Sequence, residues 1–428
     1  MGKYKDFDDD LSFDNEKYEE EPDYSEDEEE YVPRKTRTPV KKKNNKKNKR
    51  WIIILIIVIE IIVILGLLAV WYIVKKLSLV NNVRLDETQI IVNDDMDDDT
   101  KEVLKGYTNI LLLGSDSTDN SMEALERLEQ NHTDAMLVAS INNDTKEVRI
   151  ISIYRDTLLE MGVWDDKNGV IKDPEINKAT ESAFKYGIEA TISMINRNLD
   201  MDITDFVMIN WASLIDIVDA VGGVDIEINL IEQRWLNRYL VGTSESTGVQ
   251  YEDVTVFEDD GTLKDEEISS NPEMMATKRM AHMSGIQATA FARVRYGDGK
   301  ADYGRTERQR KVISEIVAKA KNLNNIDATL NAVLKSIYTS MTSDEILKMA
   351  PSMLQYKLNM IDGGFPSVKN DQIHYMEGWT FADPIIPTTL ESNVREFHRI
   401  VFDDENYEPS ATVKNISEKI ATLTGVRE

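Results

Sequence analysis

The chain has 428 residues, 41% of them hydrophobic, so it is long enough for two or three domains and can bury a large core. Its formal net charge of -27 disfavours a nucleic-acid-binding protein, and the absence of cysteine excludes disulfides, thiolate catalysis and zinc sites with cysteine ligands. We therefore expect no nucleic-acid partner. A polyanionic ligand would need a local group of arginines or a metal ion.

The first 50 residues divide into an acidic part and a basic part. Residues 1–33 carry fifteen acidic residues against three lysines, whereas residues 34–50 carry ten basic residues and no acidic one. A segment this charged and this poor in apolar residues does not bury enough surface to fold alone. We predict that residues 1–50 form a disordered cytoplasmic tail.

Residues 51–74 form an apolar run, WIIILIIVIEIIVILGLLAVWYIV, whose one charged residue is Glu60. A helix of this length spans about 36 Å, more than the ~30 Å hydrocarbon core of a bilayer. The run is too long and begins too late for a cleaved signal peptide. Because the basic residues precede it, the positive-inside rule places the N-terminus in the cytoplasm and the rest of the chain outside. We expect a single-pass protein of the cell membrane.

After the span, apolar runs and helical stripes alternate along the chain. Short apolar runs between turn residues predict strands, and apolar residues spaced by three and four predict helices. The alternation favours an α/β fold in α/β/α layers. The expected strands cover residues 108–116, 134–142, 147–156, 203–210, 224–230 and 288–297, and the expected helices cover 180–199, 211–221 and 305–323, with an irregular stretch at 231–275.

No flexible linker interrupts the chain after these elements. Helical patterns continue beyond residue 326, so we assign residues 106–428 to one extracytoplasmic domain. Residues 75–105 are expected to be a juxtamembrane linker or accessory segment between the span and this domain.

Charged residues stand where three expected strands begin or end. Asp116 follows the first strand, Asp134 opens the second, and Arg155 and Asp156 follow the third. Ends of neighbouring strands that meet at one edge of a sheet form a crevice. Each of these residues alone is more often a turn or cap residue, so only their combination indicates a site.

A second group of charged residues lies further along the chain. Arg293 and Arg295 are two apart on an expected strand, so both side chains should leave the same face. In DYGRTERQ, Asp302 is a reasonable helix N-cap, and Arg305 and Gln309 are neighbours on the first turns of the helix. Arginine forks and helix N-termini both suit phosphate. A salt-bridged surface is the alternative interpretation for each part taken alone.

Common catalytic signatures are missing from the sequence. The chain has no GxxxxGK[ST], GxSxG or HExxH motif, which disfavours P-loop nucleotide, esterase and zincin chemistry. Its four histidines show no metal-ligand spacing, and we expect none of them to be a ligand.

In their order along the chain, these motifs resemble the LytR-CpsA-Psr family of cell-wall glycopolymer transferases. The matching pieces, over residues 108–316, are NILLLGSD, HTDAMLVASIN, VRIISIYRDT, INKA, IVDAVGGVDIEI, SGIQATAFARVR and DYGRTERQRKVI. The resemblance implies a membrane-anchored α/β/α domain that binds a polyprenyl-pyrophosphate-linked teichoic acid or capsule-like polymer. It also implies transfer of the phospho-glycan to a peptidoglycan hydroxyl, with release of polyprenyl phosphate.

The resemblance assigns roles to particular residues. Asp116 and Asp134 would hold Mg²⁺, and Asp156 would orient Arg155. Among the remaining residues, Arg155, Arg293, Arg295 and Arg305 would grip the pyrophosphate, Asp302 and Gln309 would complete the catalytic site, and Asn177 and Arg308 would contribute to substrate binding.

Two positions depart from the family's pattern and keep other functions open. Many members have arginine where this chain has Thr118 and His132. Fewer fixed positive charges would weaken pyrophosphate binding, so a scaffold that holds the lipid-linked polymer without transferring it is one alternative. A hydrolase, in which water replaces the sugar hydroxyl, is another. Transcriptional attenuation, suggested by the family's older naming, is disfavoured because the cytoplasmic part contains no helix-turn-helix.

Overall fold

The computed structural model describes residues 46–117, 133–165, 170–320, 326–349, 352, 355–375, 379 and 382–427. Most of the predicted tail, together with Thr118 and His132, lies outside the described residues. The chain divides into two units, Met1–Ile64 and Leu65–Glu428. Helix α1 (Lys46–Leu77) contains one segment, Ile54–Leu77, that is long and apolar enough to cross a membrane, and no second such helix occurs among the described residues.

Only three residues separate α1 from the central sheet of the second unit. α1 ends at Leu77, and β1 (Asn81–Asn82) pairs in parallel with β10 (Tyr338–Thr339). Lys76 Nζ lies 2.5 Å from Asp327 Oδ1, and the Lys76 side chain is nearly buried. The C-terminal end of α1 is therefore held in two ways, by the pairing of the adjacent β1 with the sheet and by the ion pair of Lys76 with Asp327 near the start of α12 (Ile326–Ser336).

The central sheet has seven strands in the order β1-β10-β7-β2-β3-β4-β11. β3 is antiparallel to both β2 and β4, whereas β7 is parallel to β2 and β11 is parallel to β4. The strands predicted from the first three apolar runs and from residues 203–210 are confirmed. They are β2 (Tyr107–Ser115), β3 (Thr133–Asn142), β4 (Glu147–Ile153) and β7 (Asp205–Ile209), and β11 (Lys357–Met360) lies at the edge.

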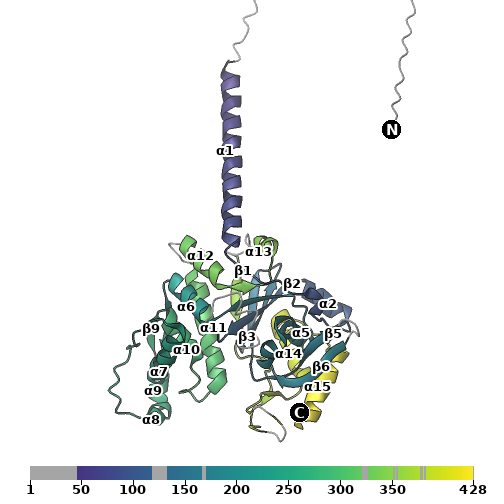
Figure 1. The fold of residues 1–428 in the computed structure, drawn as a ribbon, viewed down its shortest axis with the longest axis vertical. Coiled ribbons are helices and arrows are strands. Elements are labelled where there is room, and N and C mark those ends of the chain that lie inside the picture. Colours follow the sequence, from purple (N-terminus) through teal and green to yellow (C-terminus); the bar gives the residue numbers. More distant parts are fainter. Residues whose placement is uncertain are drawn as a thin grey trace, which may run out of the picture. The chain divides into compact units, whose positions relative to one another are not determined.

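Side chains alternate between the two faces of the sheet, so each face has its own core. On β2, Leu111 and Leu113 belong to one core, whereas Ile110 and Leu112 pack on the other side. Figure 1 shows helices on both sides of the sheet, which confirms the predicted α/β/α layers. One face is covered by α2 (Asp98–Lys105), α5 (Ile188–Leu199), α14 (Leu390–Phe402) and α15 (Ala411–Thr424), and the other by α11 (Ala301–Ala320) and α13 (Ser343–Met349).

A separate apolar core joins four helices to a two-stranded sheet. β8 (Val224–Ile228) pairs with β9 (Arg279–Met283), and both pack with α6 (Trp211–Ala220), α7 (Leu230–Thr247), α10 (Gly285–Arg293) and α11. The other elements are η1 (Glu87–Gln89), β5 (Leu158–Asp165), β6 (Val170–Lys178), α4 (Glu181–Tyr186), α8 (Asp265–Ser269), α9 (Pro272–Ala276), α12 (Ile326–Ser336), β12 (Lys369–Asn370) and β13 (Ile386–Pro387).

The strand predicted at residues 288–297 is wrong, because α10 occupies most of that segment. Ser284 and Gln287 form a capping box at the start of the helix. A Cβ at Gly285 would lie 2.3 Å from the carbonyl oxygen of Ile215, so only glycine allows α10 to approach α6 this closely. The helix is buried on nearly every side, so its sequence lacks the apolar stripe of a surface helix.

Three other boundaries differ from the predictions. Residues 231–275 are not all irregular, since Asn229 and Glu232 form a capping box that begins the long helix α7. The single helix predicted at 180–199 is two helices, α4 and α5, because Gly187 has a φ of 88° between them. Asp302 is not the N-cap of its helix but lies in the first turn of α11, which begins at Ala301.

A buried histidine gives the fold a pH-dependent stability. His398 is fully buried, its ring stacks on Tyr407 with centroids 3.6 Å apart, and its Nε2 lies 2.8 Å from the carbonyl oxygen of Leu199. Burial lowers the pKa of His398 to about 4. As the pH falls, His398 binds a proton in the unfolded chain before it does so in the folded chain. The stability that the neutral, buried ring provides is therefore present above about pH 6.5 and is lost as the pH falls toward 4.

We therefore expect His398→Gln to be less stable than the wild type at pH 7, with a gap that shrinks by up to about 3 kcal/mol by pH 4. Urea unfolding of the full chain in detergent, followed by tryptophan fluorescence, measures both free energies. His374→Gln is the matched control, since His374 is exposed. A gap that stays constant from pH 7 to pH 4 would contradict the prediction.

Candidate functional site

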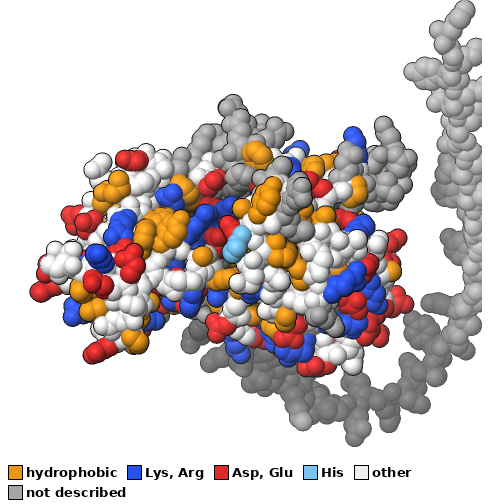
Figure 2. Space-filling view, turned by 90° about the horizontal axis from the view of Figure 1, so that it is seen from below, with side chains coloured by type: hydrophobic (Ala, Val, Ile, Leu, Met, Phe, Trp, Pro, Cys, Tyr) orange, Lys and Arg blue, Asp and Glu red, His pale blue; other side chains and the backbone are white. Residues whose placement is uncertain are grey.

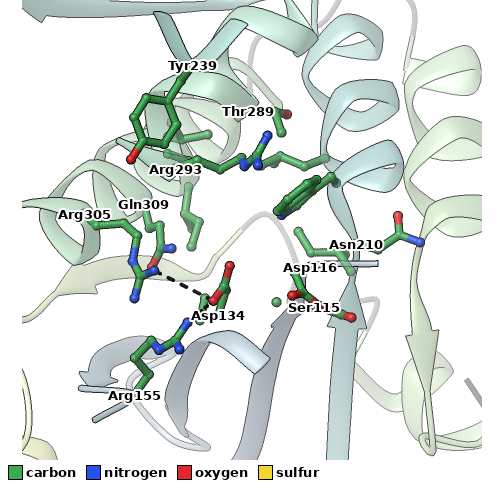
Figure 3. Close-up of a pocket in the computed structure, with 18 of the residues that line it drawn as sticks. Ser115, Asp116, Asp134, Arg155, Asn210, Tyr239, Thr289, Arg293, Arg305 and Gln309 are labelled. Carbon is green, nitrogen blue, oxygen red and sulfur yellow. Dashed lines mark hydrogen bonds and ion pairs between the residues drawn. The ribbon is translucent and has the colours of Figure 1, made fainter. Parts of the chain in front are cut away.

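The ends of the central strands open into a cavity of about 420 Å³. β2 ends at Ser115, directly before Asp116, and Ser115 pairs with Thr133 at the start of β3, so Asp134 follows on the neighbouring strand. The predicted meeting of these strand ends is therefore confirmed. Figure 3 shows both Asp116 and Asp134 among the residues that line the cavity.

Arginines from separate elements surround the carboxylate of Asp134. Arg155, just beyond β4, forms an ion pair with Asp134 Oδ1. Arg305 Nη1 and Arg295 Nη2 lie 3.8 Å and 3.9 Å from the same oxygen. Figure 3 shows Arg155 and Arg305 approaching Asp134 from different elements of the fold. One carboxylate thus lies among three guanidinium groups, more positive charge than it can neutralise.

Helix α11 supplies Arg305 from its first turns. Arg305 is 2% exposed, and its Nη2 lies 2.8 Å from Asp302 Oδ1. Its Nε is buried without a hydrogen-bond partner among the described residues. Burial lowers the pKa of Arg305 from its ordinary value, although Asp302 and Asp134 partly oppose this effect. A buried guanidinium with an unused donor is poised for a further acceptor, such as a phosphate oxygen.

Arg293 and Arg295 both line the cavity, but they do not lie on a strand. Arg293 is the last residue of α10, stacks 3.4 Å from the ring centre of Trp211, and donates to Thr243 Oγ1 over 2.6 Å. Burial lowers its pKa. Arg295 lies beyond the helix, with its Nε 3.5 Å from Asp302 Oδ1. Arg293 therefore lines the cavity from the end of α10, stacked on Trp211, whereas Arg295 lines it from the segment after the helix, beside Asp302.

The remaining predicted residues differ in their relation to the cavity. Gln309 lines it from α11. Asp156 lies behind Arg155, with Oδ2 3.8 Å from Arg155 Nε. Asn177 lies on β6 and does not line the cavity. Arg308 also lies outside it, because its buried guanidinium is 2.6 Å from Asp298 Oδ2, so its prediction as a substrate-binding residue has no support from this geometry.

Several contributors were missed by sequence reasoning. Trp211 and Tyr239 line the cavity from α6 and α7, and apolar side chains such as Leu214 and Val312 cover the part of its wall away from the arginines. Lys178 lies behind the site, with Nζ 2.7 Å from Asp156 Oδ1. The stripe positions of Trp211 and Tyr239 on their helices are indistinguishable from ordinary core positions, so no local signal marks them.

The charge of the cavity contrasts with that of the surface around it. Four arginines and two aspartates line it, and they are Arg155, Arg293, Arg295, Arg305, Asp116 and Asp134. On the face shown in Figure 2, acidic and basic side chains are intermixed. The lining of the cavity therefore carries more arginine than aspartate, within a chain whose formal net charge is -27.

The carboxylates of the cavity fit a magnesium ion by donor type. Mg²⁺ in proteins commonly takes one or two carboxylates and completes its shell with water and phosphate oxygens. Asp116 and Asp134 provide two carboxylates in one cavity. No group of three or more His, Cys, Asp or Glu suited to a metal occurs among the described residues. A metal held here would therefore need oxygens from a substrate or from water.

The fold and cavity define an α/β/α protein with an arginine-rich site at the edge of its central sheet. The chain belongs to the LytR_cpsA_psr family, whose sequence profile matches residues 79–382.

Curated relatives are similar over much of the same region. The chain is 30% identical to the polyisoprenyl-teichoic acid–peptidoglycan teichoic acid transferase TagU of Enterococcus faecalis, over 62% of this chain and 69% of that one. It is 26% identical to the TagU of Bacillus cereus, over 56% of this chain and 62% of that one. Among solved structures, "TagT bound to LIIa-WTA" aligns with a TM-score of 0.47 and 16% identity, over 75% of this chain and 98% of that one.

Proposed function

We infer that the protein transfers a phospho-glycopolymer, such as teichoic acid, from a polyprenyl pyrophosphate carrier to a hydroxyl of peptidoglycan. The observation that carries this proposal is the cluster of arginines around Asp134 in a cavity that also contains Asp116. A pyrophosphate bears enough negative charge to balance the surplus of guanidinium groups. The name of the E. faecalis relative, a teichoic acid transferase, supports the same class of reaction.

The proposed reaction exchanges one phosphorus–oxygen bond for another. The acceptor hydroxyl attacks the phosphorus next to the sugar, the bond from that phosphorus to the bridging oxygen breaks, and polyprenyl phosphate leaves while the hydroxyl proton is released. Arg155, Arg295 and Arg305 would hold the pyrophosphate oxygens and stabilise the negative charge that shifts onto the leaving phosphate. Asp116 and Asp134 would hold Mg²⁺, which supplies further charge neutralisation when bound.

The apolar wall suits the carrier better than the polymer. Leu214, Val312 and Ile313 lie in the same cavity as the arginines. A polyprenyl chain is apolar, whereas a glycopolymer is polar and is well hydrated outside the cavity. We therefore assign the apolar wall to the prenyl part of the donor.

The direct test uses a synthetic donor of defined polymer, peptidoglycan oligomer and Mg²⁺ with the full chain in detergent. Transfer predicts equal amounts of polyprenyl phosphate and polymer-linked peptidoglycan. Release of polyprenyl phosphate without linked product would instead indicate hydrolysis. Donor binding with no release would indicate a scaffold.

We further propose that α1 anchors the protein with its N-terminus in the cytoplasm, because ten basic residues precede the apolar run. Protease added to cells whose wall has been removed should digest the chain after residue 76 and leave the acidic tail intact. An antibody against residues 1–33 detects the protected fragment. Loss of the tail epitope with an intact C-terminal domain would reverse the proposed orientation.

A further inference from the structure

The end of strand β6 is bonded directly to the segment that carries Arg155. The backbone N–H of Thr180 donates to the carbonyl oxygen of Arg155 over 2.9 Å, and that of Ala179 donates to Thr157 over 2.8 Å. These two bonds hold Lys178, the last residue of β6, beside the segment that follows β4. The location of Lys178 is therefore fixed by the backbone.

The side chain of Lys178 forms an ion pair behind the cavity. Lys178 Nζ lies 2.7 Å from Asp156 Oδ1, and the two side chains are 12% and 11% exposed. The other oxygen of Asp156 lies 3.8 Å from Arg155 Nε. Arg155 in turn pairs with Asp134 on the cavity side. The four side chains thus form a row of alternating charge that leads from Lys178 into the cavity.

In this row, Arg155 lies between two carboxylates. Without a second partner, Asp156 would attract Arg155 from behind and neutralise part of the charge that Arg155 presents to the cavity. A cation at 2.7 Å satisfies Asp156 instead. Because both groups are mostly shielded from water, their interaction is screened less than that of a surface pair.

We propose that Lys178 is a positioning residue for the arginine site. By neutralising Asp156, it leaves the guanidinium of Arg155 oriented toward the cavity, with its charge available to a diphosphate. The inference rests on the proposed function only in the identity of the anion. Lys178 itself does not line the cavity and acts through Asp156 and Arg155.

The test measures binding of geranylgeranyl diphosphate to the full chain in detergent with Mg²⁺, by calorimetry. Lys178→Met should raise the Kd on the order of tenfold, and Lys178→Arg should restore most of the affinity, since it keeps the charge. Lys185→Met is the matched control, because Lys185 pairs with Glu175 at 2.8 Å and does not line the cavity. It should leave the Kd within twofold of wild type.

A second pair of variants separates positioning from a general structural role. In the Asp156→Asn background, Lys178 can no longer act on Arg155 through the Asp156 carboxylate, so adding Lys178→Met should change the Kd by less than threefold. In both Asp156→Asn and the double variant, position 156 carries no charge. The comparison between them therefore tests the proposal even if Lys178→Met alone does not melt cooperatively.

The outcomes distinguish this inference from the proposed function. A wild type that binds the diphosphate, with Lys178→Met binding equally well, overturns the positioning role alone. An effect of Lys178→Met that is as large with Asp156→Asn as without it also overturns that role. A wild type that does not bind geranylgeranyl diphosphate overturns the proposed function and this inference together.

Discussion

Replacing Arg305 with alanine should lower turnover by about 30- to 1000-fold, which corresponds to roughly 2 to 4 kcal/mol of activation free energy. Arg305 is almost completely buried, and its Nε has no hydrogen-bond partner among the described residues. Its charge is therefore fixed in a poorly hydrated site, where it stabilises a developing phosphate charge more strongly than a surface arginine would.

The same reasoning ranks the other variants of this cluster. Arg305→Lys should recover only part of the activity, because lysine keeps the charge and loses the fork. Arg295→Ala should have a smaller effect than Arg305→Ala, since the Arg295 side chain is 39% exposed. The measurement is the rate of polyprenyl phosphate release from a synthetic donor, with kcat and KM determined separately.

The control for Arg305 is an arginine of the protein surface. Arg399 forms an exposed pair with Glu396 at 2.7 Å, so Arg399→Ala should leave turnover intact and change stability by no more than about 0.5 kcal/mol. Thermal melting of each variant distinguishes a lost catalytic group from a lost fold. If Arg305→Ala melts like the wild type and turns over at the full rate, the arginine cluster is not the site.

Asp116→Asn and Asp134→Asn should each abolish most activity, by on the order of a hundredfold, together with the response to Mg²⁺. Each variant removes one of the two carboxylates proposed to hold the ion. Turnover measured across a Mg²⁺ titration, with a chelator at its start, tests both. Wild-type turnover and an unchanged Mg²⁺ response in both variants would refute the metal assignment.

The two aspartate variants should differ in stability. From the sequence, two neighbouring carboxylates would be expected to repel each other, so removing either should cost nothing in the absence of metal. The structure instead places Asp134 among three guanidinium groups. Asp134→Asn should therefore lower the free energy of unfolding by about 1 to 3 kcal/mol, because the arginines lose their shared counter-charge.

Inorganic pyrophosphate gives this stability difference a specific readout. Pyrophosphate is a multivalent anion and can replace the lost carboxylate among the arginines, so it should raise the melting temperature of Asp134→Asn more than that of Asp116→Asn. Melting curves with and without pyrophosphate measure this. If pyrophosphate raised the melting temperature of both variants equally, Asp134 would not be the counter-charge on which the stability of the arginine cluster depends.

The parts of the fold that could be predicted from the sequence are those with local signals. β2, β3 and β4 are short apolar runs with a charged residue near one end, and this pattern is sufficient to locate both the strands and the site at their ends. α10 has no comparable signal. It is buried on nearly all sides, so its apolar residues follow no stripe, and its close approach to α6 depends on Gly285.

The site residues also divide into those with a local sequence signal and those without one. Asp134 and Arg155 adjoin recognisable strands, whereas Lys178 reaches Asp156 only because β6 returns beside the end of β4. That contact links residues more than twenty positions apart through backbone pairing, which no local pattern encodes. The cavity walls formed by Trp211 and Tyr239 likewise depend on how α6 and α7 pack against α10.

The short connection between α1 and β1 has a consequence for how the protein would meet the proposed donor. Three residues extend at most about 11 Å, and the ion pair of Lys76 with Asp327 further restricts them. In the proposed topology, with α1 spanning the membrane, a domain attached in this way would not sample the volume around the cell as a domain on a long flexible tether would. It would search in two dimensions, in the same plane as a lipid-linked donor, so its rate of encounter would follow the number of donor molecules per unit area of membrane.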